Sequence, residues 1–150
     1  IDIQKENIDR ANKALQLNKI KKNIQFECMD IREYKKSNHF DVIISNPPYM
    51  DDNGKKINEN EHKAISRHEI KLSLNELISN AKRLLKPIGL LYFIHRTHRL
   101  VEIIKALDKN NFSIKKIIFI YSAQNNKSTM MFVEAVKGKK IKLEIQNYYI

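Results

Sequence analysis

The sequence predicts an α/β fold with a mostly parallel β-sheet and a C-terminal antiparallel hairpin. Two observations support this prediction. Short apolar runs typical of strands alternate along the chain with segments whose apolar residues recur at helical spacing. Near the C-terminus, two further apolar runs flank the turn-like segment SAQNNKS, residues 122–128. With 150 residues, the chain is long enough to form one domain with a packed core.

The first half of the chain predicts strands and one helix. Residues 4–17 have apolar side chains on one helical face, and Asn18 is a typical residue to end such a helix. The predicted strands are residues 1–3, which resemble the end of a strand, residues 24–28 and residues 40–45. Residues 51–71 are polar and predict a long loop, and loops of this length in compact domains are usually functional or disordered.

The second half begins with a helix start signal. Ser73 and Glu76 fit a capping box, and apolar residues at helical spacing follow as far as Lys86-Pro87. Residues 90–94 are an uninterrupted apolar run, as expected of a central strand that is covered on both faces. These signals predict a helix followed by a central strand.

One more helix and the hairpin complete the prediction. Thr97 is a candidate cap for a helix whose apolar stripe comprises Leu100, Ile103, Ile104 and Leu107. The two hairpin strands are residues 114–121 and 129–136.

The composition predicts a globular protein with a strongly basic surface. Lysine and arginine number 28 against 17 acidic residues, which gives a net charge of +11. This field would attract a polyanion such as RNA, although abundant lysine on a solvated surface is an equally good explanation. No segment approaches the roughly 20 apolar residues of a membrane span, so we predict a cytoplasmic protein without membrane contact. We also predict no bound metal. Cys28, within an apolar stretch, is predicted to be a reduced, buried thiol.

The segment SNPPYM, residues 45–50, follows the predicted strand 40–45. A residue before proline is driven into an extended conformation, and neither Pro47 nor Pro48 has an N–H group for a β-ladder. The strand must therefore end here, at the carboxyl edge of the sheet, where open α/β sheets bind ligands. The resulting rigid loop offers the amide oxygen of Asn46, free backbone carbonyls and the ring of Tyr49.

These groups suit the methylation of a conjugated exocyclic amine. Such a nitrogen is a poor nucleophile because its lone pair is delocalised. The amide oxygen of Asn46 and the carbonyl of Pro47 can accept its two N–H bonds and stabilise positive charge as the methyl group arrives. Tyr49 can stack on a base that has been turned out of its helix or loop. We therefore predict Asn46, Pro47, Pro48 and Tyr49 as the catalytic set.

The stretch FDVIISNPPY resembles motif IV of the S-adenosylmethionine-dependent amino-methyltransferases. Across essentially all 150 residues, the chain also resembles the bacterial tRNA1(Val) adenine N6-methyltransferase family. The segments that carry this second resemblance include SRHEI at 66–70, LLKPIGLLYFIHR at 84–96 and VEAVKGKK at 133–140. The resemblance implies a Rossmann-like class I methyltransferase fold, S-adenosyl-L-methionine as cofactor and tRNA as partner.

The resemblance also implies roles for individual residues. Asp2, with Ile3, matches the acidic position that binds the cofactor's ribose hydroxyls, and a carboxylate suits that diol. Asp30 matches the position beside the cofactor's adenine, which Met29 and Ile31 would line. Asn46 would face the cofactor as well as the substrate. By the same analogy, the residues near the target base and the RNA phosphates are Arg67, His68, Arg96 and Arg99.

The glycine-rich turn on which cofactor binding depends in this superfamily is missing from the sequence, because Gly54, Gly89 and Gly138 lie elsewhere. We therefore expect residues 1–150 to be a partial methyltransferase domain that begins at the second strand and lacks the first strand and the glycine turn. An N-terminal segment would be needed to complete the sheet, and the chain alone is expected to be inactive. Two alternatives stay open: a protein glutamine N5-methyltransferase and a non-catalytic nucleic-acid-binding remnant. The oligomeric state is also left open.

Overall fold

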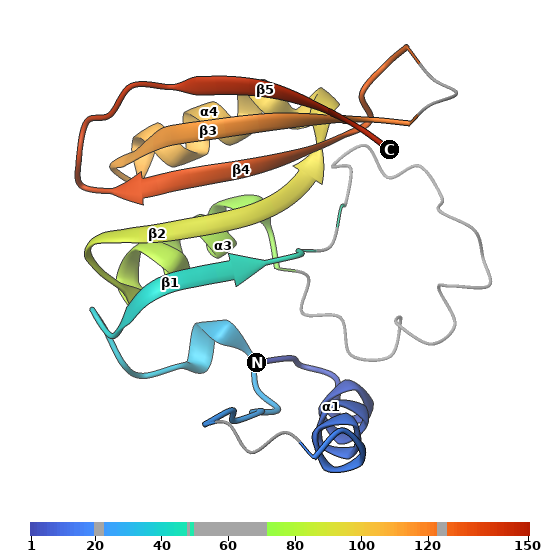
Figure 1. The fold of residues 1–150 in the computed structure, drawn as a ribbon. Coiled ribbons are helices and arrows are strands. Elements are labelled where there is room, and N and C mark those ends of the chain that lie inside the picture. Colours follow the sequence, from blue (N-terminus) through green and yellow to red (C-terminus); the bar gives the residue numbers. More distant parts are fainter. Residues whose placement is uncertain (20–22, 48, 50–71, 123–125) are drawn as a thin grey trace. The chain divides into compact units, whose positions relative to one another are not determined.

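A computed structural model describes residues 1–19, 23–47, 49, 72–122 and 126–150 (Figure 1). Contacts divide the chain into two compact units, Ile1–Lys36 and Ser37–Ile150. The predicted loop 51–71 lies outside the described residues. That the whole chain forms one partial methyltransferase domain remains a prediction.

The N-terminal unit contains helix α1, Lys5–Leu17, and a short 3-10 helix η1, Ile31–Glu33. The helix predicted at 4–17 is confirmed, with Asn18 as its C-cap. The segments predicted as strands 1–3 and 24–28 meet in a single parallel bridge between Asp2 and Cys28. Cys28 is exposed, so the prediction of a buried thiol is wrong. An apolar run buries a thiol only where a second layer covers it, and none of the described residues covers this one.

The second unit is built on a five-stranded sheet with strand order β1-β2-β4-β3-β5. Its strands are β1 Phe40–Ser45, β2 Leu85–Arg96, β3 Phe112–Tyr121, β4 Met130–Lys137 and β5 Glu144–Tyr149. β1 is parallel to β2 and β5 is parallel to β3, whereas β4 is antiparallel to both β2 and β3. Four of these five strands therefore run in the same direction, and the predicted mostly parallel sheet and β3–β4 hairpin are confirmed.

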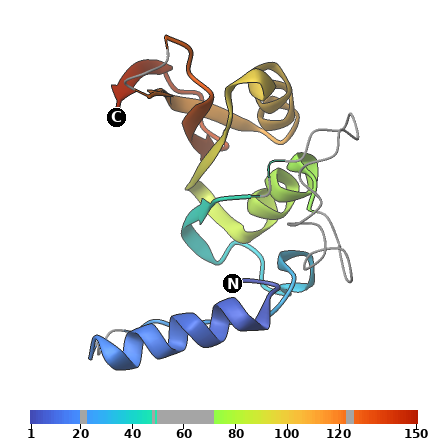
Figure 2. The same ribbon diagram turned by 90° about the vertical axis from the view of Figure 1, so that its right-hand side faces the viewer.

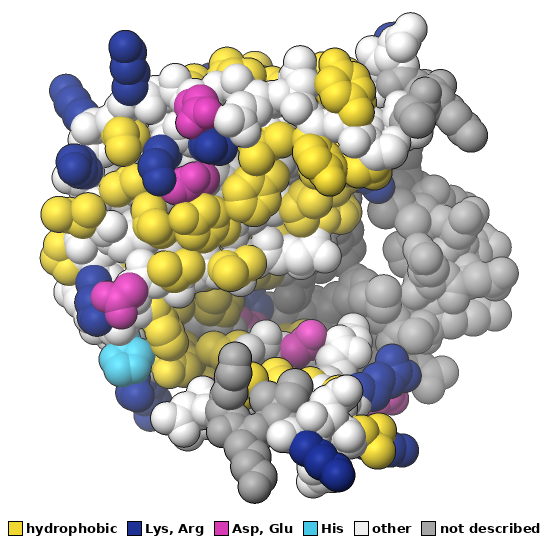
Figure 3. All heavy atoms as spheres, viewed as in Figure 1, with side chains coloured by type: hydrophobic (Ala, Val, Ile, Leu, Met, Phe, Trp, Pro, Cys, Tyr) yellow, Lys and Arg dark blue, Asp and Glu magenta, His cyan; other side chains and the backbone are white. Residues whose placement is uncertain are grey.

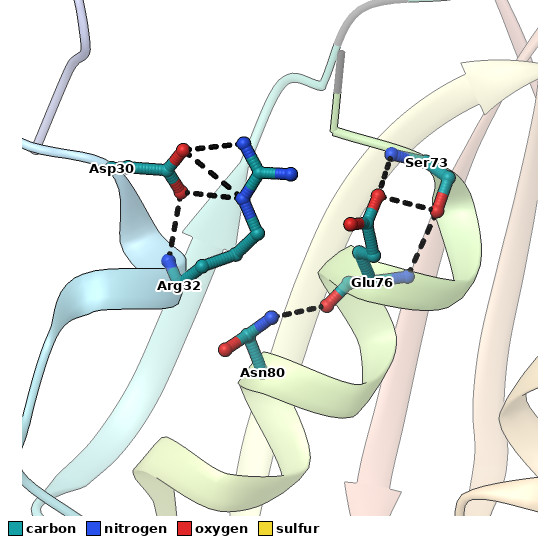
Figure 4. Close-up of polar contacts among 5 residues, drawn as sticks. All are labelled: Asp30, Arg32, Ser73, Glu76 and Asn80. Carbon is teal, nitrogen blue, oxygen red and sulfur yellow. Dashed lines mark hydrogen bonds and ion pairs between the residues drawn. The ribbon is translucent and has the colours of Figure 1, made fainter. Parts of the chain in front are cut away.

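Helix α3, Leu74–Leu84, begins with a complete capping box (Figure 4). The hydroxyl of Ser73 accepts the backbone N–H of Glu76, and the carboxylate of Glu76 accepts the backbone N–H of Ser73 at 2.8 Å. Two of the helix's otherwise unpaired N–H groups are thereby satisfied, as the sequence predicts. The helix buries Leu77, Ile78 and Ala81.

Helix α4, Leu100–Lys109, follows the 3-10 helix η2, Thr97–Arg99. Thr97 does not cap α4, because its hydroxyl lies 3.2 Å from that of Ser128 instead. The predicted apolar stripe is confirmed at Ile103 and Leu107, which are buried, but not at Ile104, which is 42% exposed. One turn of helix separates Ile103 from Leu107, and Ile104 is rotated toward solvent.

The hydrophobic core lies between α3, α4 and one face of the sheet. Figure 2 shows both helices on the same side of the strands. Every second residue of β2 points into it, so Leu91, Phe93 and His95 are fully buried. The opposite face of the sheet carries hydrophobic side chains interspersed with charged ones (Figure 3). On that face the rings of Tyr92 and Phe132 stack with centroids 5.8 Å apart. The buried face fixes the register of β2 and hence the position of the residues that follow its carboxyl end.

Candidate functional site

The Asn46-Pro47 segment leaves the sheet at the carboxyl end of β1. The strand ends at Ser45, as predicted, and Ser45 is paired with Phe93 of β2. Asn46 is exposed and Pro47 is buried. The proline ring thus anchors the start of the loop while the neighbouring amide side chain meets solvent. Pro48 lies outside the described residues.

Tyr49 contacts three of its neighbours. Its hydroxyl donates a hydrogen bond to Oδ1 of Asn46. Its ring meets the imidazole of His95 edge-on, with centroids 5.5 Å apart and planes at 76°. The guanidinium of Arg96 lies over the ring, with Cζ 5.3 Å from the centroid, an arrangement in which a cation is attracted to an aromatic face. Partial burial raises the pKa of the Tyr49 hydroxyl, with Arg96 opposing this shift, so the hydroxyl stays protonated and available as a donor.

His95 is the buried residue among the neighbours of Tyr49. Its side chain is 1% exposed, and its Nδ1 accepts the backbone N–H of Arg96 at 2.8 Å. A nitrogen that accepts carries no proton, so the ring is neutral with its proton on Nε2. Burial lowers the pKa of His95, and the positive charge of Arg99 lowers it further. His95 is therefore a rigid, uncharged surface against which the Tyr49 ring rests.

The neutral state of His95 predicts a pH dependence of folding. Its folded pKa lies below the ordinary value of 6.5, so the unfolded chain binds the proton more readily. The corresponding stability is complete above about pH 6.5 and is lost as the pH falls below it. We expect the urea midpoint of the wild type to decrease when the pH is lowered from about 7.5 to about 5.5. The decrease should be smaller in His95→Asn. If the urea midpoint depended on pH equally in the two proteins, His95 would not change its protonation on unfolding.

The predicted substrate-binding residues have different surroundings. Arg96 lies against Tyr49, as described above. Arg99 is 10% exposed and forms a bidentate ion pair with Glu102, in which Nε donates to Oε2 at 2.7 Å. Arg67 and His68 lie outside the described residues.

Of the predicted cofactor residues, Asp2, Ile3, Asp30 and Ile31 belong to the N-terminal unit, whereas Asn46 belongs to the second unit. Backbone hydrogen bonds from Asp2 to Glu27 and from Met29 to Asp2 hold the two segments side by side, which brings Asp2 close to Asp30 in the chain trace. Oδ1 of Asp2 accepts the N–H of Gln4 at 2.7 Å, and Oδ2 accepts the amide of Asn7 at 3.0 Å. A carboxylate has about four acceptor sites, so Asp2 keeps capacity for a diol.

Asp30 is held by Arg32 (Figure 4). Its carboxylate accepts the backbone N–H of Arg32 at 2.8 Å and also binds the guanidinium of the same residue, at 2.6 Å from Nη2. These hydrogen bonds lower the pKa of Asp30, so the group stays ionised. The hydrophobic neighbours predicted to line the site differ in exposure, because Ile3 is 49% exposed and Ile31 is partly buried.

Within the ranges given above, no group of three or more His, Cys, Asp and Glu side chains is placed to hold a metal ion. In the same residues, no helix is both long enough and apolar enough to cross a membrane.

Two curated proteins with similar sequences share the same name. The chain is 33% identical over 89 residues to the tRNA1(Val) (adenine(37)-N6)-methyltransferase of Phocaeicola vulgatus, which covers 59% of this chain and 37% of that protein. It is 28% identical over 105 residues to the enzyme of the same name from Aliivibrio fischeri, with coverages of 70% and 44%. The chain therefore spans about two fifths of the length of these curated relatives.

Solved structures agree on the fold. A predicted O-methyltransferase from Agrobacterium tumefaciens superposes with a TM-score of 0.64 at 20% identity, covering 99% of this chain and 66% of that one. A putative S-adenosylmethionine-dependent methyltransferase from Listeria monocytogenes gives the same TM-score at 15% identity, with coverages of 92% and 78%. The predicted Rossmann-like class I methyltransferase fold is confirmed.

The family follows from a match along most of the sequence. Residues 1–127 match the family described as Eco57I restriction-modification methylase. This range includes the Asn46-Pro47 segment, Tyr49, and His95 with Arg96. The chain belongs to the Eco57I restriction-modification methylase family.

Proposed function

We propose that this chain is part of an enzyme that methylates N6 of an adenine in tRNA with S-adenosyl-L-methionine. The observation that carries the proposal is the exposed Asn46 at the carboxyl end of β1, with Tyr49 and Arg96 beside it. The proposal draws its choice of substrate from the relatives, which are named tRNA1(Val) (adenine(37)-N6)-methyltransferases.

The residues of the N-terminal unit fit the cofactor. Asp2 has unused acceptor sites for the ribose hydroxyls, and Asp30 is an ionised acceptor with apolar Ile31 beside it. Ile3 follows Asp2 in the chain and would add apolar contact. When bound, S-adenosyl-L-methionine supplies an electrophilic methyl group on a sulfonium.

Asn46 and Pro47 would hold the adenine amine. Oδ1 of Asn46 has two lone pairs, and the Tyr49 hydroxyl occupies one of them in this structure. The second lone pair can accept one N–H of the amine, and the carbonyl of Pro47 can accept the other. Both acceptors bind more strongly as the nitrogen becomes positive, which lowers the barrier rather than the energy of the ground state.

Tyr49 would hold the base itself. Arg96 lies over the ring and the His95 imidazole contacts it in a T-shaped arrangement, so the ring is held before the substrate arrives. The base would stack on the Tyr49 ring, whose orientation Arg96 and the buried, neutral imidazole of His95 help to fix. Pro48 directly precedes Tyr49 and restricts the same loop through its fixed φ.

Variants at Tyr49 should separate its ring from its hydroxyl. Tyr49→Phe keeps the stacking face and frees the lone pair of Asn46, so we expect kcat/KM for RNA within about threefold of the wild type. Tyr49→Ala removes the ring and should lower kcat/KM by about 5- to 150-fold, the range for loss of one base-aromatic stack. Tritiated methyl transfer to RNA measures both. If Tyr49→Phe lowered kcat/KM as much as Tyr49→Ala, the hydroxyl rather than the ring would be the group that supports methyl transfer.

The substrate class is tested by offering the intact protein four candidates in the presence of labelled cofactor. They are a tRNA1(Val) transcript, the same transcript with guanine in place of the target adenine, duplex DNA, and a protein with an accessible glutamine. We expect N6-methyladenosine in the first transcript only. Label in DNA would fit the family's restriction-modification methylases, and label in protein would indicate glutamine methylation. RNA binding without any methyl transfer would indicate a non-catalytic module.

A further inference from the structure

A pocket of about 410 Å³ lies beyond the carboxyl ends of β2 and β3. Its lining comes from η2, from the end of β3, and from residues 126–128, which lead into β4. Its first lining residue, Thr97, directly follows Arg96 in the chain. The pocket shares no lining residue with the Tyr49–Arg96 pair.

Two hydroxyl groups hold the walls of the pocket together. The Ser128 hydroxyl donates to the carbonyl of Met130 at 2.7 Å, so the Thr97 hydroxyl must be the donor across the 3.2 Å contact with Ser128. The backbone N–H of Thr97 also donates to Thr129 at 3.1 Å. Both hydroxyl protons are engaged, so these side chains form the frame rather than donating to a ligand. The frame fixes the backbone beside His98 on one wall and beside Lys127 on the other.

Aromatic rings form a further part of the lining. Phe119 and Tyr121 are two residues apart on β3 and therefore project from the same face of the strand. The ring of Tyr121 stacks on Tyr149 of β5, with centroids 5.1 Å apart and planes at 22°. One face of Tyr121 is thus held by a neighbouring ring, which orders the aromatic group before any ligand binds.

The chemistry of the lining selects an anion with a flat aromatic part. Lys127 and Asn126 are exposed and supply an ammonium and an amide as donors. None of the described lining residues is acidic, so a phosphate would meet no carboxylate. The pocket is open to solvent, as a subsite for one nucleotide of a longer strand would be. A nucleotide combines the two properties, because its base stacks on aromatic rings and its phosphate pairs with lysine.

We infer that this pocket binds a nucleotide that flanks the target adenine in the RNA substrate. The base stacks on Tyr121 or Phe119, and the phosphate is bound by Lys127 and Asn126. The inference rests on the proposed function for the identity of the nucleic acid, and it adds a subsite that gives the enzyme affinity for substrates longer than the target nucleotide alone.

The test compares two RNA ligands in the intact protein. One is a short single-stranded oligonucleotide with the target adenine at its centre, and the other is adenosine monophosphate. Lys127→Ala should reduce the slope of log K against log salt for the oligonucleotide by about 0.7, the value for one lost phosphate contact on a single strand. Tyr121→Leu should weaken the oligonucleotide about 5- to 150-fold, whereas Tyr121→Phe should retain affinity. Adenosine monophosphate can itself occupy the pocket, so its binding should weaken in Lys127→Ala and Tyr121→Leu as well.

Lys105→Ala is the matched charge control, because Lys105 is exposed on α4 and does not line the pocket. It should leave the salt slope unchanged. If Tyr121→Leu fails to fold, the exposed Lys127 still provides the test. Wild-type affinity and salt slope in Lys127→Ala would overturn the pocket assignment even if the enzyme methylates RNA. A second outcome is that the variants lose affinity for the oligonucleotide while the wild type does not methylate RNA. This outcome would overturn the proposed function but would support the nucleotide-binding pocket.

Discussion

Replacing Asn46 with alanine is expected to lower kcat for methyl transfer about 10²- to 10³-fold, the usual cost of removing one preorganised polar group from a developing charge. Asn46 is exposed at the end of β1, and its amide oxygen is the acceptor on which Tyr49 already donates a hydrogen bond. Without that oxygen, one N–H of the adenine amine has no protein acceptor as positive charge develops. Single-turnover transfer of a tritiated methyl group to RNA measures the effect directly.

RNA affinity and a conservative variant serve as controls for Asn46→Ala. Affinity for RNA should change by less than about threefold, because the lost interaction is strongest in the transition state. Asn46→Asp retains an acceptor oxygen and should keep more activity than Asn46→Ala. Undiminished methyl transfer in the alanine variant would refute the role proposed for Asn46. A parallel loss of kcat and RNA binding would instead indicate a collapsed loop.

The parts of the site that the sequence predicts are those set by neighbouring residues in the chain. Asn46 and Pro47 are positioned by a strand that has to stop, since proline cannot continue the ladder. The start of α3 is equally local, because Ser73 and Glu76 are three residues apart and satisfy each other's backbone. In both places the chemistry and the geometry are encoded within a few positions, and tertiary contacts only have to agree with them.

The contacts of Tyr49 are not predictable in this way. His95 and Arg96 are more than forty positions away along the chain and reach Tyr49 only because β2 lies parallel to β1 in a particular register. An isolated histidine in an apolar run gives no sign of which ring it will support. The hydrogen bond between Tyr49 and Asn46 is similarly invisible, because motif spacing does not specify a side-chain rotamer.

Other differences have the same origin. Thr97 does not form the predicted helix cap, because its hydroxyl forms a tertiary hydrogen bond with Ser128 instead. A hydroxyl can form a hydrogen bond to a distant segment as easily as to its own helix. Strand β5 is not predicted from the sequence, because every one of its residues is exposed. No buried face therefore imposes an alternating apolar pattern on the strand. The pocket that joins η2, β3 and the start of β4 likewise depends on strand order, which a linear pattern leaves undetermined.

Phe93→Ala should lower the free energy of unfolding of the second unit by about 3–5 kcal/mol, the range for truncating a buried aromatic ring. The ring is 1% exposed in β2, within the cluster that joins the sheet to α3 and α4. Truncation would leave a cavity that neighbouring strands cannot close without breaking their ladders. Urea unfolding followed by far-UV circular dichroism measures the change, provided that the denaturant slope stays constant.

Phe132→Ala is the matched control for Phe93→Ala, because it removes the same ring from the opposite, partly exposed face of the sheet. Its loss should be clearly smaller, since less apolar surface returns to water and no closed cavity forms. Equal losses would mean that both faces of the sheet are covered to the same extent in solution. Phe93 is also the ladder partner of Ser45, the residue before Asn46. Its truncation should therefore reduce methyl transfer even below the unfolding midpoint, because the strand end that positions the amide would lose its packed neighbour.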